Sequence, residues 1–322
     1  MQRPFWPGES RGDDLTVAVL RQLEVIGAAW GLGGADPGCA EAADVLAPLV
    51  VEKLARCGAE VSVGPVVRHE SSDRRKAAVV AKLCGALAAA VADALRRGRL
   101  PCVLGGDHSC AGGTWSGAAR ALHGPLGLLW IDAHMDSHTP RTSHTGRLHG
   151  MPLAWLLGED DDPLYGLTTG VLDPRHVCLL GVRSYEPEED ERLRRLGVRV
   201  MLVEEVARRG LGAALEEGLA IATGGTRAYG VSIDLDVVTP DEAPGVGTPV
   251  AGGPGARELA GALTLVARTP NLAAIELVEY SPRRDASRRT AQVAVELLAA
   301  ALCGRTGDDS QVLAQAVQRY DP

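Results

Sequence analysis

The segment Trp130-Ile-Asp-Ala-His-Met-Asp136 joins the end of an apolar run to polar side chains at alternate positions. Alternate side chains of a β-strand point to the same face, so a strand here directs Asp132, His134 and Asp136 to one side. Carboxylates and an imidazole at this spacing suit a metal ion. The segment therefore predicts a buried strand that presents metal ligands at its end.

Two other segments place the same residue types after apolar runs. Val103-Leu-Gly-Gly-Asp-His108 supplies a second histidine, and Val231-Ser-Ile-Asp-Leu-Asp236 repeats the alternating carboxylates at Asp234 and Asp236. Four carboxylates cannot be crowded together at neutral pH without cations, because like charges raise their pKa values until some are protonated. For one segment alone, a solvated loop that caps the next helix is the alternative. Agreement among three segments favours a site for two divalent metal ions.

Strand-like and helix-like runs alternate along the chain, which predicts a parallel sheet covered by helices. The expected strands are 24–30, 60–67, 101–104, 126–131, 176–181, 198–203, 228–233 and 272–279. The expected helices are 40–57, 75–97, 187–196, 212–222, 256–267 and 288–303. No internal repeat or linker stands out, so we expect a three-layer α/β/α fold with a mainly parallel sheet, in a single domain over residues 1–322.

Composition limits the classes of function. The formal net charge is -8 and no dense basic patch with interleaved aromatic residues is present, so we expect no nucleic-acid partner. The 7 cysteines are scattered without a Cys-x-x-Cys pair, an odd number that no complete disulfide framework uses. No signal pattern opens the sequence, and no apolar stretch approaches the roughly 20 residues of a membrane span. We therefore expect a cytoplasmic protein with reduced thiols and no membrane partner.

The three segments resemble, in order, spacing and strand context, the arginase and agmatinase family of binuclear manganese ureohydrolases. The resemblance extends from Val25-Ile-Gly27 to the helix after Pro282. It implies two Mn²⁺ ions, although Co²⁺, Ni²⁺ and Fe²⁺ accept similar oxygen and nitrogen ligands. It also implies a homo-oligomer, a trimer or hexamer. The implied ligands are His108 and Asp136 for one ion, His134 and Asp236 for the other, and Asp132 and Asp234 as bridges.

The same resemblance implies a reaction and its catalytic residues. A hydroxide that bridges the two ions would attack a guanidinium carbon, because coordination lowers the pKa of water toward neutrality. Asp136 would orient this hydroxide. His149, in Gly146-Arg-Leu-His-Gly-Met-Pro152, resembles the family's proton-shuttle histidine, with an ordinary surface histidine as the alternative. Glu279, in Val278-Glu-Tyr-Ser-Pro282, resembles the glutamate that pairs with the substrate guanidinium, with a capping or solvated carboxylate as the alternative.

Two irregular stretches, 137–150 and 239–254, follow strands that carry ligand candidates, which is where open α/β sheets bind their ligands. Arginases commonly hold the substrate α-carboxylate and amino groups with Asn, Ser and Asn, and the matching positions here are His138, Thr145 and Arg147. Thr145 keeps a hydroxyl group. Arg147 brings a permanent cation whose planar donors suit a carboxylate. These three positions therefore bear on which groups the substrate carries at the end away from its guanidinium.

Three further residues bear on substrate binding. Glu186 would compensate a substrate α-ammonium, where arginases usually place a shorter aspartate. Thr248 matches the loop expected near the guanidinium, with a simple turn residue as the alternative. Thr239 stands where many relatives have aspartate before proline. This change affects the residues that hold the metal ligands in place more than the ligands themselves.

The expected function is hydrolysis of L-arginine to ornithine and urea by a binuclear-metal amidinohydrolase. The alternatives within the enzyme class are an ω-guanidino acid hydrolase, for example for 4-guanidinobutyrate, and an N-hydroxyarginine hydrolase. Arg147 motivates the first of these. A noncatalytic relative that binds a guanidino ligand and regulates another process is the alternative outside the enzyme class.

Overall fold

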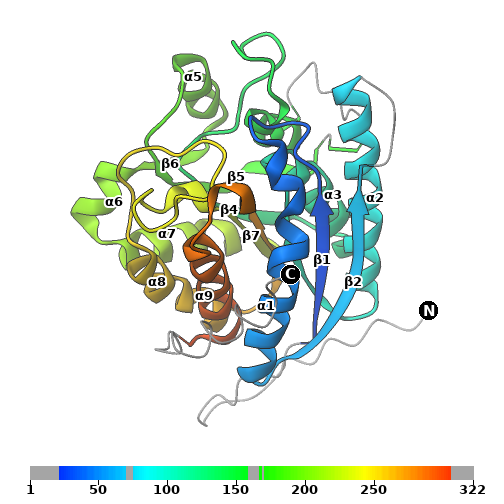
Figure 1. Ribbon diagram of the computed structural model, residues 1–322. Coiled ribbons are helices and arrows are strands. Elements are labelled where there is room, and N and C mark those ends of the chain that lie inside the picture. Colours follow the sequence, from blue (N-terminus) through cyan, green and yellow to red (C-terminus); the bar gives the residue numbers. More distant parts are fainter. Residues whose placement is uncertain (1–21, 70–74, 159–166, 169, 306–322) are drawn as a thin grey trace.

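The computed structural model describes residues 22–69, 75–158, 167–168 and 170–305. Its centre is one sheet of 8 strands in the order β2-β1-β3-β8-β7-β4-β5-β6, and all neighbouring strands pair in parallel. Helices lie on both faces of this sheet (Figure 1). The expected three-layer α/β/α architecture is confirmed.

The elements have the following bounds. The strands are β1 Gln22–Ala29, β2 Glu60–Arg68, β3 Leu100–Leu104, β4 Leu126–Ile131, β5 Leu172–Val182, β6 Arg199–Leu202, β7 Ala228–Asp234 and β8 Leu272–Val278. The helices are α1 Ala42–Arg56, α2 Lys76–Arg96, α3 Ala111–Leu122, α4 Pro152–Leu156, α5 Pro187–Leu196, α6 Val203–Arg209, α7 Leu211–Thr223, α8 Ala256–Arg268 and α9 Arg289–Cys303.

Two hydrophobic cores, one on each face of the sheet, hold the three layers together. The first combines buried residues of α1, α6, α7, α8 and α9 with one face of the strands. The second combines α2, α3, α4 and α5 with the other face. Strands covered on both faces are largely apolar, and the six residues of β4 are all buried. This burial on both sides places the ends of the central strands inside the molecule.

Helix α3 was not predicted, because its Gly-rich start has a low helix propensity. The structure supplies a packing reason for these glycines. A Cβ atom on Gly113 would lie 2.7 Å from the backbone oxygen of Cys84 in α2, and one on Gly117 would lie 2.5 Å from that of Ala88. The glycines therefore let α2 and α3 approach closely, and the tertiary contact outweighs the local preference.

The bounds of several other elements also differ from the prediction by one to four residues. The expected strand 198–203 ends at Leu202, and α6 begins at the next residue, Val203. The expected strand 176–181 begins earlier, at Leu172, as the central part of a longer β5. The sequence pattern identified these strands, but side-chain periodicity alone did not locate their ends.

Helix α2 corrects the expectation that no stretch is long and apolar enough to span a membrane. By length and composition alone it qualifies, with a mean hydropathy of 1.8. However, 56% of its apolar window is buried inside the protein. Leu83, Leu87 and Val91 contribute to the second core, so the apolar character of α2 is accounted for by packing.

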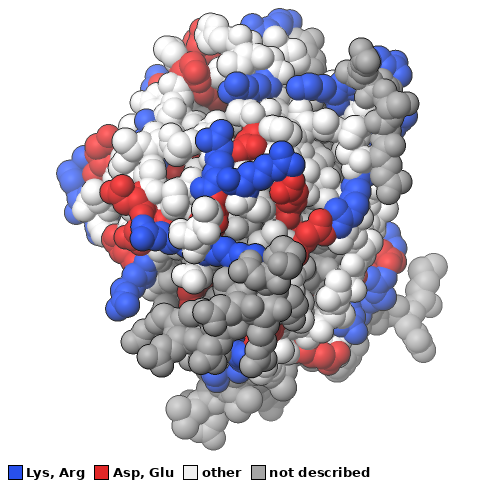
Figure 2. Space-filling model, in the orientation of Figure 1, with Lys and Arg blue, Asp and Glu red and all other residues white. Residues whose placement is uncertain are grey.

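The surface in the view of Figure 2 carries basic and acidic side chains that are interspersed. Ion pairs among the exposed side chains of the described residues include Arg68 with Asp44 and Arg283 with Glu41. Such exposed pairs contribute little to stability, typically about 0–1 kcal/mol each. They do not position the central residues described next.

Candidate metal centre

The ligand candidates follow neighbouring strands in the middle of the sheet. The order β3-β8-β7-β4 places the ends of these strands side by side. His108 opens a short 3-10 helix after β3, Asp132 directly follows β4, and Asp234 is the last residue of β7. Local turns then bring the alternate residues inward. The Asp132 carboxylate accepts the backbone N–H of His134 at 2.7 Å, and the Asp234 carboxylate accepts that of Asp236 at 2.9 Å.

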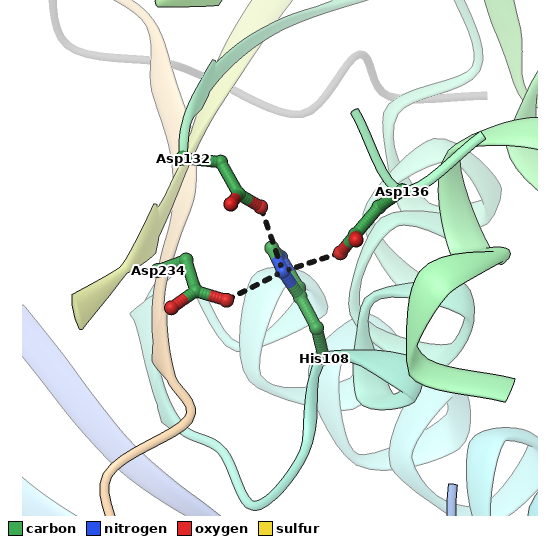
Figure 3. Close-up of side chains that lie close together, drawn as sticks. All are labelled: His108, Asp132, Asp136 and Asp234. Carbon is green, nitrogen blue, oxygen red and sulfur yellow. Dashed lines mark ion pairs between the residues drawn. The ribbon is translucent and has the colours of Figure 1, made fainter. Parts of the chain in front are cut away.

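One group of ligands consists of His108, Asp132, Asp136 and Asp234, all of them buried. Figure 3 shows the three carboxylates pointing toward the imidazole of His108. The Nδ1 atom of His108 lies 3.2 Å from Asp132 Oδ2, 2.9 Å from Asp136 Oδ2 and 3.1 Å from Asp234 Oδ2. Side chains from three strand ends therefore converge on one point.

A second group consists of Asp132, His134 and Asp236. The Nδ1 atom of His134 lies 3.0 Å from Asp236 Oδ2 and 3.6 Å from Asp132 Oδ1. Asp132 belongs to both groups, as a bridging carboxylate would. Asp234 belongs to the first group only, so its own bridging role stays a prediction. The structure thus brings together all six residues that the sequence assigned to the metal site.

Ser232 and Trp130 orient the buried ring of His108. Its Nδ1 has no hydrogen-bond partner among the described residues, although it faces the carboxylates. Its Nε2 lies 2.9 Å from Ser232 Oγ, which in turn donates to Glu276 Oε1 at 2.7 Å. The ring also stacks on Trp130, with centroids 4.2 Å apart. A hydrogen bond at one ring nitrogen leaves the other free to bind a metal ion, so these residues fit the implied centre.

The charges of the cluster give a second reason for cations. Burial and the charge of Asp132 raise the pKa of Asp136 to about 6. Burial, together with Asp236 and Asp132, raises the pKa of Asp234 well above its ordinary value. Burial also raises the pKa of Asp132, but the nearby imidazoles of His108 and His134 outweigh this effect and lower that pKa. Divalent cations at this position would offset the repulsion between the carboxylates and favour their charged forms.

His149 lies beside the ligands and is held by Glu279. Its Nδ1 is 2.8 Å from Glu279 Oε1, and its side chain is 14% exposed. Burial of His149 opposes its protonation, but the charge and hydrogen bond of Glu279 outweigh this effect and raise its pKa to about 9. Glu279 itself is buried behind His149 and also accepts the backbone N–H of His108 at 2.9 Å. Its contact with a substrate guanidinium stays a prediction.

A cavity of about 190 Å³ opens beside the ligand groups. Its lining includes His134, Asp136, His149 and five residues expected to bind substrate, namely His138, Thr145, Arg147, Glu186 and Thr248, whereas Glu279 is not among its lining residues. The Thr248 hydroxyl donates to Asp236 Oδ2 at 3.2 Å, which ties its loop to a ligand. The substrate-loop candidates and the ligands therefore share one cavity.

Five further lining residues had no role assigned from the sequence, namely Ser143, His144 and Gly150 in the predicted substrate loop 137–150, and Ser184 and Glu189 outside it. Glu189 is the most informative, because it lies 3.4 Å from His138 Nε2 and accepts the backbone N–H of Ser137 at 3.0 Å. Burial raises the pKa of Glu189 to about 8. In the sequence, Glu189 follows Glu186 by three residues at the start of α5. This is the spacing of a helix capping box, and it was the sequence feature that could have drawn attention to Glu189.

Comparison with known proteins agrees with this geometry. Residues 21–304 match the sequence model of the arginase family. The chain is 40% identical over 260 residues to the arginase of Bacillus caldovelox, covering 77% of this chain and 87% of that one. A crystal structure of arginase from Bacillus cereus has a TM-score of 0.82 at 34% identity and covers 88% of this chain and 98% of that one.

The fold is also found in a protein with a different name. A Trypanosoma cruzi formiminoglutamase has a TM-score of 0.73 at 20% identity, and the match covers 88% of this chain and 93% of that one. The family is decided by the sequence match over most of the chain and by the curated relative at 40% identity. The chain belongs to the arginase family of hydrolases that act on amidine C–N bonds.

Proposed function

We propose that this protein hydrolyses L-arginine to ornithine and urea, using two Mn²⁺ ions held by His108, Asp132, His134, Asp136, Asp234 and Asp236. The observation that carries the proposal is the pair of overlapping ligand groups that share Asp132, next to a cavity lined by His149. The similarity to arginases supports the choice of substrate. Ligands of oxygen and nitrogen, with no thiolate among them, support manganese over a structural zinc ion.

Three of the proposed ligands, His134, Asp136 and Asp234, line the cavity where the reacting carbon would lie. Divalent ions held by these residues would lower the pKa of water and would so supply a nucleophile at neutral pH. Asp136 both belongs to the first ligand group and lines the cavity, so its carboxylate is placed to accept a hydrogen bond from the attacking group. Its backbone has a φ of 46°, in the left-handed region that non-glycine residues rarely adopt.

His149 is placed to move a proton to the departing amine. Its Nδ1 is occupied by Glu279, so Nε2 remains for exchange with substrate or solvent in the cavity. Glu279 raises the pKa of the His149 imidazole to about 9, so the imidazole is protonated at neutral pH. A protonated imidazole donates to a leaving amine and takes a proton back from water afterwards, which is general acid–base catalysis.

The far end of the cavity decides between substrates. Arg147 is exposed at its rim and suits a carboxylate, which both L-arginine and 4-guanidinobutyrate carry. Glu186 suits the α-ammonium that only arginine carries. However, Glu186 Oε2 already lies 2.9 Å from His138 Nε2. This contact favours 4-guanidinobutyrate as the second candidate, because it partly satisfies the carboxylate without an ammonium group.

Product analysis separates the two candidates. Manganese-loaded protein receives a mixture of L-arginine, agmatine, 4-guanidinobutyrate and N-hydroxyarginine, and the products are identified by mass spectrometry. We expect ornithine and urea in equal amounts. Preferential release of 4-aminobutyrate would move the assignment to a guanidino acid hydrolase. An Arg147→Asn variant should change the preference between arginine and agmatine, because agmatine has no carboxylate for Arg147 to bind.

A further inference from the structure

A third group of metal-ligating side chains lies at the outer part of the cavity. It consists of His138, Glu186 and Glu189, whose ligand atoms lie within 4.8 Å of one another. His138 Nε2 is 2.9 Å from Glu186 Oε2 and 3.4 Å from Glu189 Oε2. Glu186 is the N-cap residue of α5 and Glu189 lies in its first turn, whereas His138 comes from the loop after β4. Segments distant in sequence therefore bring one imidazole and two carboxylates to the same point.

His138 is oriented in the same way as His108. In His108 one ring nitrogen faces carboxylates and the other lies 2.9 Å from the Ser232 hydroxyl. In His138 the Nε2 atom faces the carboxylates, and Nδ1 lies 3.1 Å from the Thr142 hydroxyl. Thr142 is itself fixed, because its Oγ1 accepts the backbone N–H of Thr139 at 3.0 Å. A metal-binding histidine usually has its second nitrogen held by a hydrogen bond of this kind, which sets the tautomer and the ring plane.

The surroundings allow an ion to enter and to keep an open position. All three residues line the cavity. The side chain of Glu186 is 48% exposed, whereas those of His138 and Glu189 are 12% and 4% exposed. One imidazole and two carboxylates with room for water resemble the open three-ligand sets that bind zinc. We propose that His138, Glu186 and Glu189 form a third divalent-cation site, separate from the binuclear centre and filled by Zn²⁺ or Co²⁺ more weakly than that centre.

A simpler arrangement accounts for the same contacts without an ion. Glu189 Oε2 accepts the backbone N–H of Glu186 at 3.1 Å as part of the capping box of α5, and His138 pairs with Glu186. In that case His138 and Glu186 form an ion pair, and Glu189 only caps the start of α5. The two readings differ in a measurable way, because only the first predicts an additional bound ion.

The experiment counts and locates ions, so it does not depend on turnover. Crystals of the manganese-loaded protein are soaked in ZnCl₂, and anomalous diffraction is recorded above and below the zinc edge. We expect a zinc peak within coordination distance of His138 Nε2, at about 2.0–2.1 Å. Zinc confined to the binuclear centre, or no zinc peak at all, would overturn the proposal.

Variants assign the ligands in solution. By equilibrium dialysis with Zn²⁺, the manganese-loaded wild-type protein should bind one ion more per chain than the His138→Ala and Glu186→Gln variants. His144→Ala is the matched control, because His144 lines the same cavity outside the cluster and should keep the additional ion. Thr142→Val should weaken the third site by about 10- to 100-fold, and Thr142→Ser should restore it. Loss of the ion in His144→Ala with retention in His138→Ala would contradict the ligand assignment.

A consequence for activity rests on the proposed function. An ion at this site occupies the part of the cavity where the substrate tail would lie, so excess Zn²⁺ should raise KM for L-arginine with little change in kcat. The Thr142→Val variant should require about 10- to 100-fold more Zn²⁺ for the same effect. If the protein hydrolyses no guanidino compound, the proposed function fails, but the zinc peak and the dialysis result still decide the third site.

Discussion

The Nδ1 atom of His149 lies 2.8 Å from Oε1 of Glu279, although the two residues are 130 positions apart in the sequence. The same oxygen accepts the backbone N–H of His108 at 2.9 Å. Glu279 has a φ of 64°, a strained conformation for a non-glycine residue of the kind that often occurs at functional sites. One buried carboxylate thus connects the proposed proton-transfer group to the loop that carries a metal ligand.

This relationship predicts the pH dependence of Glu279→Gln. Glu279 raises the pKa of His149 to about 9, so the acid form persists at alkaline pH and is lost only as the pH rises through that value. A neutral glutamine removes the charge, and the alkaline limb of kcat should move down by about one pH unit or more. The pH–rate profile and the titration of the imidazole by NMR measure this. An unchanged alkaline limb would mean that His149 is not the group that transfers the proton.

His149→Ala should slow turnover and leave the metal in place. General acid–base catalysis is worth about 10²- to 10⁴-fold in rate, so we expect kcat to fall by at least about 100-fold. Metal content by mass spectrometry should equal that of the wild type, because His149 belongs to neither ligand group. Added imidazole should restore part of the rate. Loss of metal in this variant would indicate that His149 is a ligand instead.

Ser232→Ala tests how His108 is oriented. Removal of the hydroxyl leaves His108 Nε2 and Glu276 without this shared partner, so metal affinity should fall by about 10- to 100-fold. Ser116→Ala is a matched control, because the Ser116 hydroxyl is buried and has no hydrogen-bond partner among the described residues. The control should keep wild-type metal affinity. Equal affinities in the two variants would mean that Ser232 does not position the ligand.

The packing of α2 against α3 predicts opposite effects for two glycine substitutions. Gly117→Ala places a Cβ atom 2.5 Å from the backbone oxygen of Ala88, and we expect a loss of about 1–3 kcal/mol in the free energy of unfolding. Gly85→Ala, within α2, meets nothing within 4 Å and should gain about 0.5–1 kcal/mol from helix propensity. Denaturant unfolding measures both. A stabilising Gly117→Ala would contradict the close helix contact.

The fold was largely predictable, because buried parallel strands and amphipathic helices leave periodic patterns in the sequence. Helix α3 was not, since its glycines reduce the local helix signal and are explained only by contact with α2. The convergence of the ligand candidates was also predictable, because the Asp-x-His-x-Asp and Asp-x-Asp spacings repeat after apolar strands. The resemblance to arginases supplied their roles, whereas the sequence alone supplied only their chemistry.

The contacts between distant segments could not be predicted. The pairing of His149 with Glu279 and that of His138 with Glu186 depend on how loops from separate strands meet. Glu189 was missed because its capping-box position gave no indication that the start of α5 faces the cavity. The oligomeric state, the cellular location and the identity of the metal stay predictions.

The most direct test of the central claim is to measure metal content and urea release together, in the wild type and in Asp132→Ala. Asp132 belongs to both ligand groups, so its loss should weaken the whole centre. For the wild type we predict two Mn²⁺ ions per chain and urea in equal amount to ornithine. Asp132→Ala should lose both the metal and the activity. Full activity in Asp132→Ala, or no product from wild-type protein that holds two ions, would contradict the account.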